Sequence, residues 1–106
     1  MSVNRIRERE LIIPALRAAA AQPEGEIEMT KLIAELTEEF QPSGEDAAII
    51  DGRNDSKFSQ KVRNLVSHRE SSTSMFTKGY ATYQPHAESI TITDLGRKFL
   101  DQVPGV

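Results

Sequence analysis

Residues 55–69 constrain the fold more than any other segment, because they combine a helical apolar pattern with concentrated positive charge. The apolar side chains fall at i, i+4, i+7 and i+8, the spacing of one face of an α-helix. They are Phe58, Val62, Leu65 and Val66. Asp55 or Ser56 is a suitable N-cap for such a helix. The segment therefore predicts an amphipathic helix with one buried face.

The pattern changes from helical to alternating after this segment. Residues 80–84 and 89–93 alternate as β-strands do, and a turn containing Pro85 joins them. We therefore expect a β-hairpin. Thr93 is then placed to cap a short closing helix that buries three side chains. These are Leu95, Phe99 and Leu100.

The first half of the chain predicts two more helices and a brief strand. Residues 5–21 have helically spaced apolar residues, but Pro14 fits only the first turn, so regular helix should begin near Leu11. Residues 26–28 alternate, and residues 30–40 return to helical spacing. Helices followed directly by a hairpin and a last helix indicate an α+β winged helix. This is a helix-turn-helix variant with a C-terminal β-hairpin wing and a closing helix.

Charge is distributed unevenly along the chain. The net charge is −3, yet residues 52–69 carry +4, which leaves −7 for the remainder. The cations of this stretch are Arg53, Lys57, Lys61, Arg63 and Arg69. Residues 24–51 hold nine acidic side chains against Lys31 alone. Such polarity directs a nucleic acid toward one surface and repels it from another.

The exposed face of the basic helix carries side chains that can read DNA. Arginine pairs with guanine O6 and N7, and asparagine or glutamine with adenine N6 and N7. The expected base contacts are Gln60, Arg63, Asn64 and Ser67. The expected backbone contacts are Arg53, Ser56, Lys57, Lys61, His68, Arg69, Lys78 and His86. The sequence thus predicts a helix that enters the major groove of double-stranded DNA.

Patterns that suggest catalysis have simpler explanations. Asp55-Ser56-Lys57 matches the end of a nuclease metal motif, but that motif requires a strand, whereas this triplet begins a helix. His68 and His86 lack the spacing of a zinc site. Cysteine is absent, which excludes disulfides and thiolate ligands. We expect neither an enzyme nor a bound cofactor or metal.

Length and hydropathy indicate one domain, 1–106, in the cytoplasm. A chain of 106 residues has the size of a single domain. Its longest apolar runs are far too short to cross a bilayer, and its N-terminus lacks the apolar region of a signal peptide.

Two runs of sequence, residues 52–69 and 78–100, resemble the winged-helix modules attached to restriction endonucleases. The N-terminal domains of Mrr-type enzymes are similar in their hydrophobic first helix, basic third helix and closing element, iT-x-x-Gly-Arg-x-(Phe/Leu)-Leu. In this chain the element consists of Ile92, Thr93, Gly96, Arg97, Phe99 and Leu100. Related winged helices of methylation-dependent enzymes recognise N6-methyladenine. The resemblance implies a targeting module of a restriction or defence system, with a nuclease domain or partner. It also implies a pocket for the methyl group, lined either by Phe76, Tyr80 and Tyr83 or by the basic helix itself.

Two other functions fit the same predicted fold. One is a transcriptional regulator that forms a homodimer and reads a two-part DNA site. The other is a protein-interaction domain in which the acidic helix at residues 30–40 is the working surface and DNA is not bound.

Overall fold

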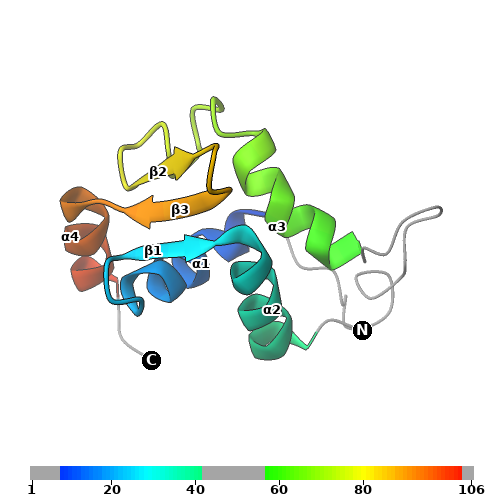
Figure 1. The fold of residues 1–106 in the computed structure, drawn as a ribbon. Coiled ribbons are helices and arrows are strands. Elements are labelled where there is room, and N and C mark those ends of the chain that lie inside the picture. Colours follow the sequence, from blue (N-terminus) through cyan, green and yellow to red (C-terminus); the bar gives the residue numbers. More distant parts are fainter. Residues whose placement is uncertain (1–7, 42–56, 104–106) are drawn as a thin grey trace, which may run out of the picture.

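The computed structural model describes residues 8–41 and 57–103, which form an α+β fold (Figure 1). A short 3-10 helix, η1, leads into four α-helices and a three-stranded antiparallel sheet. The bounds are η1 Glu8–Leu11, α1 Ile12–Ala20, β1 Glu26–Glu28, α2 Met29–Phe40, α3 Lys57–Ser67, β2 Ala81–Gln84, β3 Ser89–Ile92 and α4 Asp94–Gln102. The predicted α+β class and the predicted order of helices and strands are confirmed for the described residues.

Helix α1 begins where the sequence predicted, just after Leu11, and Pro14 lies in its first turn. Proline is tolerated there because the first N–H groups of a helix have no partner within it. Leu16 and Ala19 are buried on the face that packs against β1 and β3, whereas Arg17 is exposed. The helix therefore closes one face of the sheet.

The sheet has the strand order β1-β3-β2, with the last strand of the chain in the centre. Ile27 of β1, Ile90 of β3 and Tyr83 of β2 lie opposite one another. Since side chains alternate between faces, this row points toward the core. The neighbouring row, which holds Ser89, is polar, and the Ser89 hydroxyl donates to the Glu26 carboxylate. One face of the sheet is thus apolar and the other polar.

Helix α3 docks by the predicted stripe. Phe58, Val62 and Leu65 are buried, and Val66 is partly buried beside them. The helix packs against α2, where the ring centroids of Phe40 and Phe58 are 5.8 Å apart. The predicted caps of this helix, at residues 55–56, lie outside the described residues.

Helix α4 confirms one prediction and corrects another. Thr93 caps it, with its hydroxyl accepting from the Gly96 N–H at 3.0 Å. Phe99 and Leu100 are partly buried, but the prediction for Leu95 was wrong, because half of that side chain is exposed. Positions 96, 99 and 100 face the core, one helical turn apart. Leu95 therefore projects from the edge of this face.

Helices α3 and α4 lie at opposite ends of the sheet (Figure 1). Within the described ranges, 8–41 and 57–103, no helix is both long and apolar enough to cross a membrane.

Candidate nucleic-acid interface

The face of α3 opposite its buried stripe presents the predicted base-contacting residues. Arg63 and Ser67 are exposed, and Gln60 and Asn64 are half-buried. These four residues recur at intervals of three or four, which places them along one side of the helix. The structure therefore brings together all four side chains that the sequence grouped.

Gln60 and Asn64 are joined by a hydrogen bond one helical turn apart. Gln60 Nε2 donates to Asn64 Oδ1 at 3.0 Å. An amide oxygen has two lone pairs, so Asn64 Oδ1 can accept a second hydrogen bond while its amide nitrogen donates. Asn64 thus has both the acceptor and the donor that bidentate pairing with adenine requires. The hydrogen bond fixes the direction in which this amide points.

The predicted phosphate contacts on α3 differ in exposure. Lys57 in the first turn is exposed, Lys61 is half-buried and His68 follows the helix in an exposed position. The two lysines lie four residues apart, on the flank of the face that carries Arg63. Cations on the flanks of a recognition helix are suited to the phosphates that line the groove. Arg53 and Ser56 lie outside the described residues.

Arg69 is held by the protein itself. Its Nη1 donates to the Val66 carbonyl at 2.9 Å, close to the C-terminal end of α3. The guanidinium also lies over the ring of Tyr83 in β2, with its Cζ atom 5.3 Å from the ring centroid. The sequence does not reveal this pairing, because no spacing rule relates a residue after a helix to a strand fourteen positions later.

The two predicted contacts on the hairpin are separated. Lys78 precedes the base of the hairpin, beside Gly79, whose carbonyl accepts from the Thr93 hydroxyl at 2.6 Å. His86 is exposed in the turn at the opposite end. Strands of four residues extend roughly 13 Å, so Lys78 and His86 cannot contact the same phosphate.

Negative charge lies near the hairpin turn. Ala87, next to His86, lines a shallow hollow together with Glu24, Glu26 and Glu28. Acidic groups reduce the electrostatic attraction of phosphate to this turn. Helix α3 is therefore the better supported part of the candidate interface, and the turn is the weaker part.

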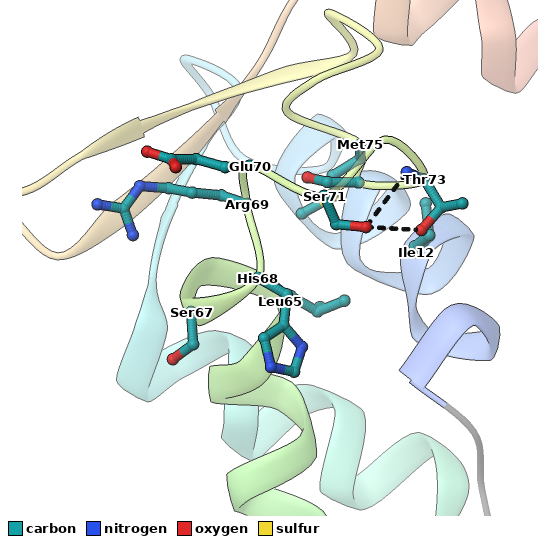
Figure 2. Close-up of a pocket in the computed structure, with 10 residues that line it drawn as sticks. Ile12, Leu65, Ser67, His68, Arg69, Glu70, Ser71, Thr73 and Met75 are labelled. Atoms are coloured by element: carbon teal, nitrogen blue, oxygen red, sulfur yellow. Dashed lines mark hydrogen bonds between the residues drawn. The ribbon is translucent and has the colours of Figure 1, made fainter.

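A hollow of about 940 Å³ lies at the C-terminal end of α3 (Figure 2). Hydroxyl groups line much of it, on the helix and on the loop that leads to β2. Its lining residues are Ile12, Leu65, Ser67, His68, Arg69, Glu70, Ser71, Thr73, Ser74 and Met75. Ser71 and Thr73 are hydrogen-bonded through their hydroxyls at 3.1 Å. Sequence analysis did not assign these hydroxyls to the site, although the Ser/Thr-rich loop was a visible signal.

The three aromatic residues predicted for a methyl pocket each contact other parts of the protein, and Phe76 is partly buried against the core. Tyr80 stacks on Phe99 of α4, with centroids 4.4 Å apart and ring planes 10° apart. Tyr83 lies beneath Arg69.

Helix α2 carries the opposite charge. Glu38 and Glu39 are exposed and line a groove that also includes Glu35 and Arg17. The acidic surface of α2 and the basic face of α3 lie on two helices that pack together. Because the two helices carry opposite charge, the electrostatic potential attracts a polyanion to α3 rather than to α2.

The described residues include no group of three or more histidine, aspartate or glutamate side chains placed to hold a metal ion. Asp55, the acid of the nuclease-like triplet, lies outside them. Comparison of the chain with protein-family models, curated proteins and solved structures found no match.

Proposed function

We propose that this chain is a winged-helix domain that binds double-stranded DNA through α3 in the major groove. The observation that carries the proposal is the two-sided character of α3: Phe58, Val62 and Leu65 are buried on one side, and Arg63 is exposed on the other. A recognition helix needs one face to dock on its domain and another to reach base edges. The β2–β3 hairpin is the wing in this proposal.

The proposed contacts divide into two kinds. Gln60, Arg63, Asn64 and Ser67 reach base edges, whereas the flanking cations bind phosphates. Lys57 and Lys61 contribute most to the phosphate contacts, because they share α3 with the readers. His68, Lys78, His86, Arg53 and Ser56 add contacts around them.

We propose a targeting role without catalysis, in a restriction or defence system. Support comes from the resemblance of the third helix and of the closing element to Mrr-type modules. In that element the Thr93 hydroxyl accepts from Gly96 N–H and donates to the Gly79 carbonyl, which joins the hairpin to α4. A module of this kind brings a nuclease domain or partner to its DNA site.

Arg63→Ala should weaken binding to the preferred duplex by about 1–3 kcal/mol and relax the preference for guanine at one position. The reason is that a bidentate guanine contact is lost while the docking of α3 is unchanged. The measurement is a titration of duplexes that carry each of the four base pairs at that position. The matched control is Arg17→Ala, because Arg17 is an exposed arginine of α1. Equal losses on every duplex would assign Arg63 to the phosphate backbone.

The site is also proposed to read N6-methyladenine, with Asn64 at the methylated base. Methylation leaves adenine one amino hydrogen, so the reader keeps a hydrogen bond and gains apolar contact. Each buried methyl should tighten binding roughly fourfold, since a buried CH₂ contributes about 0.8 kcal/mol. Matched duplexes methylated on neither, one or both strands test this. If all three duplexes bind with equal affinity while Arg63→Ala still weakens binding, the chain binds DNA without reading methylation.

A further inference from the structure

We propose that Arg69 is a positioning residue that fixes the hairpin against the C-terminal end of α3 through a cation–π contact with Tyr83. This inference rests on the proposed function, because the placement of the hairpin matters for binding when α3 and the hairpin engage one duplex. Sequence analysis grouped Arg69 with the phosphate contacts, and the two roles predict different results.

The backbone of Arg69 is held on both sides. Its N–H donates to the Val66 carbonyl at 3.1 Å, and its own carbonyl accepts from the Thr77 hydroxyl at 2.9 Å. The first contact binds it to α3 and the second to the loop that precedes β2. The Arg69 side chain therefore extends from a fixed point between the two elements.

The guanidinium then joins the end of α3 to the hairpin. Nη1 donates to the Val66 carbonyl, and the planar group lies over the Tyr83 ring, 5.3 Å from its centroid. Arginine is suited to this because its flat group can stack on a ring while its N–H groups bond in the plane. A lysine ammonium keeps the charge but lacks the flat surface. Figure 2 shows the side chain extending away from Ser71 and Thr73.

The connection between α3 and the hairpin is irregular. Residues 68–80, which connect α3 to β2, contain turns and bends and no helix or strand. Tyr83 is half-buried on the core face of the sheet, opposite Ile90. Arg69 thus covers the outer part of a ring whose inner part is anchored in the sheet. Removing either partner leaves the connecting loop and the pairing of β3 with β1 to place β2 relative to α3.

The test measures duplex affinity and its salt dependence for the full chain and its variants. Arg69→Gln and Tyr83→Leu should each weaken binding about two- to fivefold, the size expected for a lost cation–π contact at an exposed site. The double variant should be no weaker than either single variant. Tyr83→Phe keeps the aromatic face and should bind as the wild type does, whereas Arg69→Lys should not restore affinity.

The salt dependence separates positioning from phosphate binding. If Arg69 contacts no phosphate, Arg69→Gln leaves the slope of log K against log salt unchanged, whereas Lys61→Gln reduces it by about one unit. A slope reduced by one in Arg69→Gln, with Tyr83→Leu binding normally, would overturn the proposal and make Arg69 a phosphate contact.

One readout does not depend on DNA. The side-chain protons of Arg69 should show an upfield ring-current shift in NMR spectra, retained in Tyr83→Phe and lost in Tyr83→Leu. If the wild type does not bind duplex, the proposed function fails while this shift still reports the tether. An Arg69 spectrum that is the same in all three proteins would overturn the tether whether or not DNA binds. Arg69 is exposed, so Arg69→Gln is the variant to use in the duplex titrations if Tyr83→Leu does not fold, and the shift is then read from the wild type and Tyr83→Phe.

Discussion

Gly96→Ala is expected to destabilise the domain by about 3 kcal/mol, the upper end of the usual cost of overpacking a core. A β-carbon at this position would lie 2.1 Å from the Tyr80 carbonyl oxygen and 2.8 Å from Ile92 Cγ1. The carbonyl cannot move cheaply, because it accepts from the Thr93 N–H at 2.9 Å, where the hairpin meets α4. Urea denaturation of both proteins measures the difference.

The sign of this effect is its sharpest feature. In an ordinary helix interior, alanine is more stable than glycine by about 1 kcal/mol. Lys98→Ala, on the exposed side of the same helix, is the matched control and should change stability by less than about 0.5 kcal/mol. A stabilised Gly96→Ala protein would contradict the packing of α4 against the hairpin.

The fold was largely predictable because its signals are local. Strands were predicted at 80–84 and 89–93, and each observed strand is one residue shorter at one end. Strand β1 occupies the predicted residues 26–28. The Thr93 cap was readable because it needs only a hydroxyl and an N–H three residues later. The pairing of β1 with β3 could not be read in this way, since it joins residues more than sixty positions apart.

The candidate site was predictable where it depends on helical phase. Gln60, Arg63, Asn64 and Ser67 share the side of α3 opposite the buried stripe, as the period of 3.6 residues requires. Leu95 was misjudged because three apolar residues in a nine-residue helix do not fix which of them lies at the edge. Arg69 shows the other limit, because a cation that looked available in the sequence lies over the Tyr83 ring in the fold.

Duplex affinity is expected to fall about 100-fold between 50 and 200 mM monovalent salt. The cations proposed as phosphate contacts, Arg53, Lys57, Lys61 and Lys78, should neutralise about four phosphates. Each neutralised phosphate releases a counterion, so the slope of log K against log salt should be about −3 to −4. The net charge of the chain is −3, so overall attraction cannot produce this result. A steep salt dependence requires the cations to face the duplex while the acidic residues of α2 face away from it.

The most direct test of DNA binding is this slope, measured for the wild type, Lys61→Gln and Lys98→Gln on one duplex. Lys98 is exposed on α4, at the opposite end of the sheet from α3 (Figure 1). Lys98→Gln removes one positive charge, as Lys61→Gln does, so the two variants have the same net charge. The account predicts a steep slope for the wild type, a slope reduced by about one unit in Lys61→Gln and no change in Lys98→Gln. Affinity that does not vary with salt, or equal effects of the two substitutions, would contradict recognition of DNA through α3.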